Sequence, residues 1–116
     1  MDYQRVQVAP EDANNLQQII DGAPAYTTIE LSEGQYHTSL EVINKNHLIL
    51  SGKGDVWFIT EDPNEPVLSI QESENLTLEN INGIHAVERG LCEGAVLEIL
   101  QSQNLEIRDG AFNGSG

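Results

Sequence analysis

Three segments of this 116-residue chain superpose when the sequence is aligned with itself. They begin at Leu40, Leu68 and Leu97, so their first positions recur at a nearly constant spacing along the chain. Self-similarity at a fixed period, here about 28 residues, is typical of proteins that stack one short structural unit on the next. Apolar residues recur in the segments at matching offsets: Val42, Ile70 and Ile99; Leu48, Leu76 and Leu105; Leu50, Leu78 and Ile107.

Each segment alternates apolar with mostly polar residues, which is the pattern of short strands that bury one face. A third set of positions follows a similar spacing and would be continued by residues 111–113. We therefore expect three short strands in each unit, stacked in parallel so that equivalent Leu and Ile side chains form columns. The third set consists of Ile29 with Leu31, Val56 with Phe58, and Ile84 with Ala86.

Residues 1–26 differ from the rest of the chain. Val6 and Val8 alternate as a short strand, and residues 10–14 carry the signals of a helix start. Apolar residues at helical spacing follow, and Gly22 and Pro24 end the helix. We expect this helix to cap the first unit, because the terminal units of a stack otherwise expose their core. The pattern predicts one domain over residues 1–116, with a strand and capping helix in 1–26 and stacked units in 27–116 whose carboxyl end has no cap.

Two motifs carry a resemblance to a known family. Residues 31–36 read Leu-x-x-Gly-x-Tyr and residues 48–52 read Leu-x-Leu-x-Gly, after an amino-terminal helix. Over residues 5–115 the chain resembles the N-terminal rungs of right-handed parallel β-helix proteins of the pectate-lyase-like superfamily. The resemblance implies an all-β fold, a short right-handed parallel β-helix of about three to four rungs with an N-terminal capping α-helix. It also implies a secreted or cell-surface location, although no signal-peptide pattern is visible at Met1.

Charge and composition exclude several classes of protein. The chain has 5 Lys and Arg residues against 19 Asp and Glu residues, for a net charge of −14. This balance disfavours binding to nucleic acid or to an anionic membrane, both of which require basic patches. The single cysteine, Cys92, rules out a disulfide within the chain and a cysteine-based zinc site.

Outward positions of the third strand set supply the candidate binding site. The alignment places Glu30, Trp57 and His85 in one column, which would form a platform for a sugar ring between polar groups. The alternative is that Trp57 packs beneath residues 60–66 or the N-terminal strand. His85 with Glu88 and Arg89 is the one cluster suited to acid–base chemistry, and a solvated salt-bridged loop is its alternative.

We expect no metal site and no cofactor, with calcium as the alternative for so acidic a chain. Neither an EF-hand nor a nonapeptide calcium repeat is present. Asn46, Asn75 and Asn104 precede the middle strands and predict a ladder of stacked amides. The candidate oxygen ligands for calcium are Asp62, Asn64, Glu65, Glu72, Glu74, Glu98 and Glu106.

No lyase, hydrolase or epimerase signature of the superfamily occurs in the chain. We therefore expect a non-enzymatic scaffold or binding module, either a fragment or the N-terminal part of a longer β-helix protein. A carbohydrate-active domain that binds or cleaves an acidic polysaccharide and a fragment of a surface adhesin are the alternatives. The unit over residues 97–112 would expose its strand edges, which predicts self-association through that end.

Overall fold

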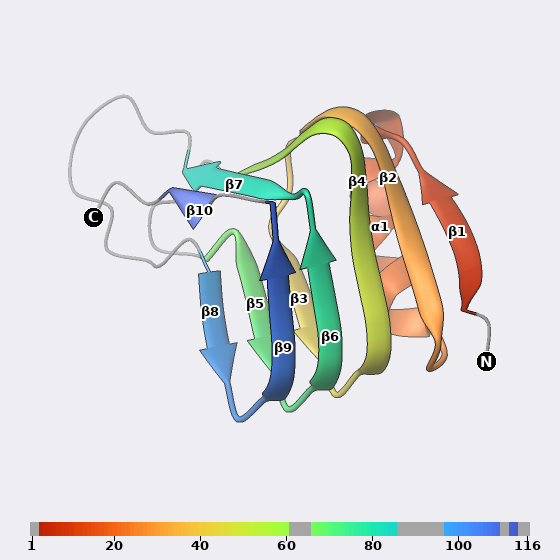
Figure 1. The fold of residues 1–116 in the computed structure, drawn as a ribbon. Helices are drawn as coiled ribbons and strands as arrows, with labels where there is room; N and C mark the ends of the chain where they lie inside the picture. Colours follow the sequence, from red (N-terminus) through yellow and green to blue (C-terminus); the bar gives the residue numbers. More distant parts are fainter. Residues whose placement is uncertain (1–2, 61–65, 86–96, 110–111, 114–116) are drawn as a thin grey trace.

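The computed structural model describes residues 3–60, 66–85, 97–109 and 112–113, which form two parallel sheets and one α-helix (Figure 1). The larger sheet has the order β1-β2-β4-β6-β9, with β7 paired to β4 and to β10, and the smaller sheet has the order β3-β5-β8. The predictions of a mostly β fold, of parallel pairing and of one N-terminal helix are confirmed. The elements are β1 (Gln4–Val8), a 3-10 turn (Pro10–Asp12), α1 (Ala13–Gly22), β2 (Thr27–Tyr36), β3 (Leu40–Ile43), β4 (Asn46–Thr60), β5 (Leu68–Gln71), β6 (Glu74–Glu79), β7 (Asn82–His85), β8 (Leu97–Leu100), β9 (Gln103–Arg108) and β10 (Phe112–Asn113).

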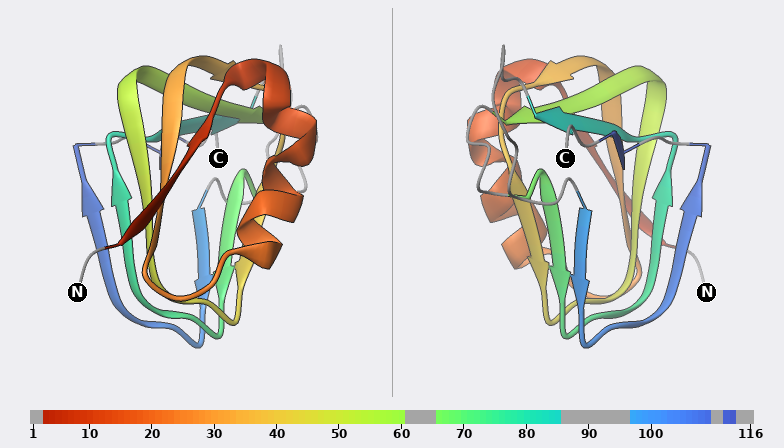
Figure 2. Two further views of the ribbon diagram at one scale, coloured as in Figure 1. Left: turned by 90° about the vertical axis from the view of Figure 1, so that its right-hand side faces the viewer. Right: turned by 90° about the vertical axis from the view of Figure 1, so that its left-hand side faces the viewer.

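The strand register pairs the residues that the self-alignment superposes. In the smaller sheet Leu40 pairs with Leu68, and Leu68 pairs with Leu97. In the larger sheet Leu50 pairs with Leu78, and Leu78 pairs with Ile107. The two sheets lie on opposite sides of the molecule (Figure 2), and the apolar columns pack between them as one core. The sequence repeat in these two columns thus has a structural cause: residues one period apart along the chain are hydrogen-bonded neighbours in the sheets.

The third strand set was aligned wrongly, because β4 runs without interruption through Gly52 and Gly54. Its first half pairs with β6 and its second half with β7. Ile29 consequently pairs with Leu50 and not with Val56, while Val56 pairs with Gly34 beyond a register shift in β2. The glycines in the Gly52-Lys53-Gly54 run let the strand bend where the sequence suggested a turn. Ala86, the last member of the predicted set, lies outside the described residues.

The turns that lead from the smaller to the larger sheet repeat one backbone conformation. Their first residues, Asn44, Glu72 and Gln101, all have φ between 49° and 56°. Their fourth residues, His47, Asn75 and Asn104, have φ between 54° and 57°. Non-glycine residues adopt this left-handed region at a cost of roughly 1–2 kcal/mol each, so the surrounding structure has to impose it.

Serine hydroxyls link these turns to one another. The Ser73 hydroxyl accepts a hydrogen bond of 3.0 Å from the Lys45 backbone, and Ser102 accepts one of 3.1 Å from the Ser73 backbone. One bond of the predicted amide ladder is present, in which Asn75 Nδ2 donates to Asn46 Oδ1 at 3.0 Å. Each turn therefore binds the equivalent turn of the next layer through side chains as well as through backbone.

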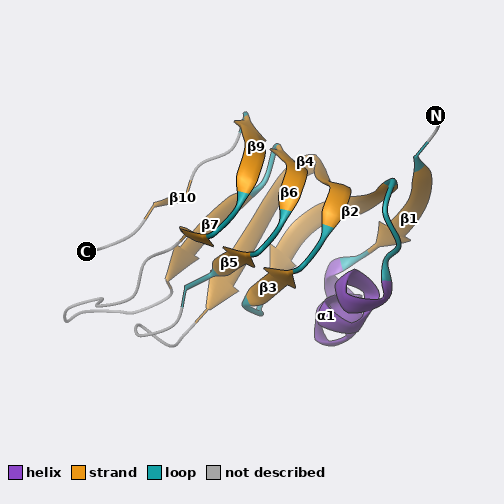
Figure 3. Ribbon diagram, turned by 90° about the horizontal axis from the view of Figure 1, so that it is seen from below, coloured by secondary structure: helices purple, strands orange, loops and turns teal. Residues whose placement is uncertain are grey.

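Helix α1 covers the free edge of β3. Its Leu16 and Ile20 side chains are completely buried. The Gln17 amide replaces a neighbouring strand, because Nε2 donates to the Glu41 carbonyl at 2.7 Å and Oε1 accepts from the Glu41 N–H at 2.8 Å. Lys45 Nζ donates to the Asp21 and Ala23 carbonyls at the end of the helix, at 2.7 and 3.2 Å. Seen from below, α1 and β9 lie at opposite ends of the row of strands (Figure 3).

Tyr36 fastens β1 to the bulged part of β2. Its side chain is fully buried against Phe58, with 5.1 Å between the ring centroids. The hydroxyl group donates to the Ser32 carbonyl at 2.8 Å and also lies 3.1 Å from the Val8 carbonyl. Burial raises the pKa of Tyr36 to about 12, since the phenolate would lose its hydration.

The raised pKa predicts a loss of stability in alkali. Unfolded Tyr36 ionises near pH 10, whereas the folded state keeps its proton until about pH 12, so stability falls as pH rises through this window. The shift corresponds to up to about 2–3 kcal/mol. Urea denaturation of wild type and Tyr36→Phe at a series of pH values measures it. We expect the wild type to be more stable by about 1 kcal/mol below pH 9 and to lose that advantage above pH 10. A difference that stays constant across the series would contradict the assignment.

Candidate functional site

The predicted column of Glu30, Trp57 and His85 is wrong. Glu30 pairs with Gln7 and Ser51, Trp57 with Gln35 and Asn82, and His85 with Thr60. The three residues therefore lie at three different register positions of the larger sheet. The error follows from the continuity of β4, because the strand places Leu50 beside Ile29, where the alignment assumed Val56.

Each member of that predicted site has another environment. Glu30 forms a 3.4 Å salt bridge with Lys53 on the neighbouring strand. Trp57 is half-buried, and its indole N–H donates to Asp55 Oδ1 at 3.2 Å. The side chain of His85 lies outside the described residues, as do Glu88, Arg89 and residues 61–65.

The candidate calcium ligands do not converge where they are described. Glu98 accepts a 3.1 Å hydrogen bond from the buried Ser69 hydroxyl, and Glu106 binds Arg108. The described part of the chain holds no group of three or more metal-ligating His, Cys, Asp or Glu side chains. Asp62, Asn64 and Glu65 fall outside that part. Within the same residues, no helix has the length and apolar character needed to cross a membrane.

A shallow pocket opens on the outer side of the smaller sheet. It is lined by Ser39, Leu40, Glu41, Pro66 and Ser69. The Ser69 hydroxyl donates to Glu98 and accepts from Gln71 Nε2 at 3.0 Å, so both of its neighbours fix it in place. A serine nucleophile requires an adjacent general base such as histidine, and this arrangement provides a carboxylate and an amide. Among the described residues, the groups that hold the Ser69 hydroxyl are this carboxylate and this amide.

The strongest candidate site is the end of the stack formed by β8 and β9. Inward side chains are almost fully buried in the earlier layers but are half-buried or exposed here. Along one column the exposed fraction is 0% at Ile29, 2% at Leu50, 3% at Leu78 and then 43% at Ile107. Along the other column, Val42 and Ile70 are buried and Ile99 is 42% exposed. We call this surface the end face and define it by Leu97, Ile99, Leu105 and Ile107 with the outer backbone edges of β8 and β9.

Among the described residues, the outer backbone edges of the end face are also unpaired. β8 pairs with β5 and β9 with β6, and no described residue pairs with the opposite edge of either strand. The Ser102 hydroxyl is bound by the layer beneath, whereas no described hydroxyl lies on the other side to accept from the Ser102 N–H. An open edge of this kind can pair with another strand.

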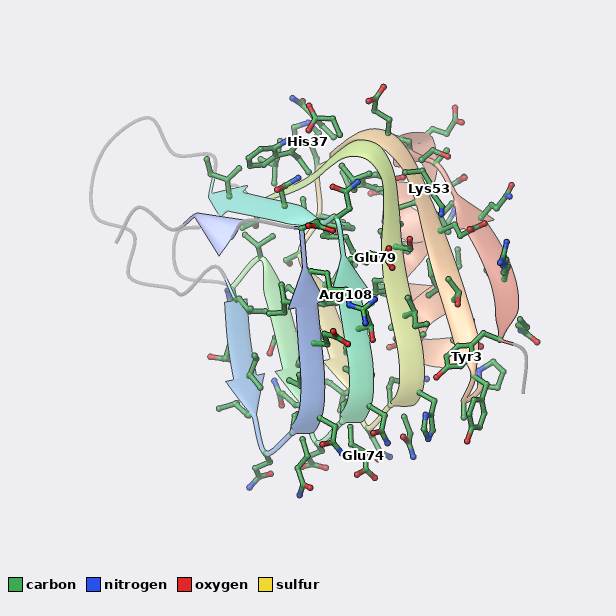
Figure 4. The ribbon with its side chains drawn as sticks, viewed as in Figure 1. Tyr3, His37, Lys53, Glu74, Glu79 and Arg108 are labelled. Carbon is green, nitrogen blue, oxygen red and sulfur yellow. The ribbon has the colours of Figure 1, made fainter. Side chains whose placement is uncertain are left out.

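A charged pair borders the end face on the outer side of the larger sheet. Arg108 donates to both carboxylate oxygens of Glu106, from Nε at 2.7 Å and from Nη2 at 3.0 Å. The hydrogen bonds from Arg108 lower the pKa of Glu106 and raise that of the arginine, and both side chains are exposed. Glu79 follows in the layer beneath, directly beside Arg108 (Figure 4). The period-2 alternation of β9 placed Glu106 and Arg108 on one face and was the signal that could have revealed the pair.

Comparison of the chain with protein-family models, with curated proteins and with solved structures finds no match. Its function therefore has to follow from the geometry of the end face and of the charged pair that borders it.

Proposed function

We propose that this chain is a non-enzymatic scaffold, a short right-handed parallel β-helix whose binding surface is the end face. Parallel pairing throughout, registers that advance by nearly the same step from layer to layer, and turns of one conformation support a coil of equivalent layers. Connections between parallel strands are right-handed in nearly all proteins, which gives the hand of the coil.

The abrupt change in exposure at the last layer carries the proposal. Ile99 and Ile107 occupy the same columns as side chains that are at most 3% exposed, yet they are 42% and 43% exposed. Covering the remaining apolar surface of each would contribute about 1 kcal/mol, and pairing the open edges would satisfy their N–H and C=O groups. The chemistry that fits this surface is another layer of β-strands with apolar inward side chains.

The opposite end of the stack shows what a covered edge looks like. There Gln17 binds both backbone groups of Glu41, and Leu16 and Ile20 complete the core. Within the described residues the end face has no equivalent of this helix. A partner bound at the end face would therefore cover the open backbone edge of β8, as α1 covers the edge of β3.

The substitutions Ile99→Lys and Ile107→Lys together test the proposal. We expect one of two results for the wild type. Either sedimentation velocity shows that it associates as its concentration rises, or it stays monomeric and binds a dye specific for apolar surface. The double variant should do neither, because two lysines would be desolvated at the covered face. Ile43→Lys is the matched control: Ile43 is also 42% exposed but lies on β3, and its variant should behave as wild type.

A wild-type monomer that binds no dye and does not associate would overturn the proposal. So would identical behaviour of the double variant and wild type. Enzymatic function is tested separately by incubating wild type with a panel of acidic polysaccharides, with and without calcium. We expect no cleavage of any polysaccharide. Cleavage would show a lyase or hydrolase activity and contradict the non-enzymatic scaffold function.

A further inference from the structure

We infer that the partner that covers the end face is a second copy of this chain, related to the first by a two-fold axis. In this dimer β9 pairs antiparallel with β9 of the second copy around Ile107, and Glu106 of each copy faces Arg108 of the other. The inference rests on the proposed function and adds the identity of the partner and the register of the contact.

Helix α1 opposes head-to-tail stacking of copies through the smaller sheet. Head-to-tail stacking would place β8 of one copy on the edge of β3 in the next. That edge is occupied, since Gln17 binds both backbone groups of Glu41. A copy that displaced α1 from β3 would expose the Leu16 and Ile20 side chains of the helix, which are fully buried. It would also break the hydrogen bonds from Lys45 to the end of the helix. Stacking of β8 on β3 is therefore blocked, which favours contact of end face with end face and a closed two-fold arrangement.

Charge selects the register within that contact. Residues directly opposite in an antiparallel pair share a face, so the two-fold axis has to pass beside one residue of β9. An axis at Glu106 or at Arg108 sets two like charges directly opposite each other. An axis at Ile107 places Glu106 opposite Arg108 twice, which makes a square of alternating charges on the outer side of the sheet.

Burial points to the same residue. Ile107 is 43% exposed, whereas Leu105 on the same side of β9 is half-buried, so Ile107 gains most from being covered. An axis at Leu105 would instead set Ile107 against Gln103, an apolar side chain against a polar one. Arg108 is the one basic residue of β8 and β9, and it already holds Glu106 in a two-bond pair that is free to exchange partners.

Mixing two charge variants tests the contact between copies. Glu106→Arg and Arg108→Glu each break the pair within the chain and create like-charge contacts across the axis. Each variant alone should dimerise at least about tenfold more weakly than wild type in sedimentation equilibrium. An equimolar mixture should recover wild-type affinity, because every arginine then faces a glutamate. Glu11→Arg and Arg5→Glu change the net charge by the same amounts at the opposite end of the molecule and should leave dimerisation unchanged.

Disulfide formation tests the register. In a Cys92→Ser background, the Ile107→Cys variant should form a disulfide-linked dimer, since opposed Cα atoms lie roughly 4.5–5.5 Å apart in an antiparallel pair. Leu105→Cys should not, because its two copies would be about 13 Å apart along the strands. A mixed disulfide between Leu105→Cys and Ile107→Cys chains, without one between two Ile107→Cys chains, would overturn the register.

The results separate this inference from the proposed function. A wild-type protein that binds the apolar dye but stays monomeric at every concentration overturns the two-fold dimer and leaves the end face as the binding surface. Dimerisation that is insensitive to both charge variants overturns the contact at β9. A monomer that binds no dye contradicts the proposed function and the inference together.

Discussion

Replacing Gly52 by alanine is expected to lower the free energy of unfolding by about 3 kcal/mol or more. A Cβ atom at Gly52 would lie 2.2 Å from the backbone oxygen of Asn80 and 3.1 Å from Cγ2 of Val56. The collision is severe because Asn80 belongs to the next layer and is itself held. Its N–H donates to the Arg108 carbonyl at 2.7 Å, and its side chain donates to the carbonyls of Gly52 and Gly54 at 3.1 and 2.8 Å.

Gly22→Ala is the matched control for this experiment. A Cβ atom there meets nothing within 4 Å, and the residue is the last of α1, where alanine is favoured over glycine. We expect no loss of stability, or a gain of up to about 1 kcal/mol. Thermal denaturation of both variants measures the difference, with Gly52→Ala shifted down by more than about 10 °C. Equal melting temperatures would show that the two layers do not approach as closely as described.

The second large effect is expected from Leu50→Ala, in the column that runs from Ile29 to Ile107. Leu50 is 2% exposed between Ile29 and Leu78, so truncation leaves a cavity between two layers. The expected loss is about 2–5 kcal/mol. Urea denaturation at a protein concentration low enough to keep the chain monomeric measures it.

Ile107→Ala supplies the control from the same column. In the monomer this side chain is 43% exposed and has a neighbour on one side only, so its truncation should cost less than about 1.5 kcal/mol. The difference in unfolding free energy between the two variants measures how much stability a side chain contributes when it has neighbouring layers on both sides. Equal losses at the two positions would contradict the open end face.

Much of the fold could be predicted from the sequence because the strand register repeats the period of the apolar residues. The columns through Leu40 and Leu50 were found in this way, and the capping helix followed from the spacing around Leu16 and Ile20. The course of β4 could not be predicted. Glycines usually mark turns, yet Gly54 with φ 94° continues the strand through a bend, and this shifted the whole third strand set.

The candidate site, like the fold, could be predicted from the sequence only in part. The end face was predicted because a stack of similar layers has two ends and only one carried a helix. The single column of Glu30, Trp57 and His85 was wrong because it depended on the third strand set, whose offset was wrong by several residues. The serine ladder through Ser73 and Ser102 was missed because serine is common in turns of every kind, and its hydrogen bonds depend on the separation of the layers.

The parallel registers also determine how this chain reaches its structure. Every strand pairing joins residues that are far apart in the sequence, from Thr27 with Leu48 at the shortest separation to pairs such as Leu68 with Leu97 at the longest. None of the described pairings can form as a local hairpin, so the first of them has to close a loop of this size without support from a neighbouring layer. Each later layer closes a loop of similar length onto an existing edge. Folding should therefore be limited by one slow initial encounter, on the scale of about milliseconds to seconds for topologies of this kind, and then proceed layer by layer.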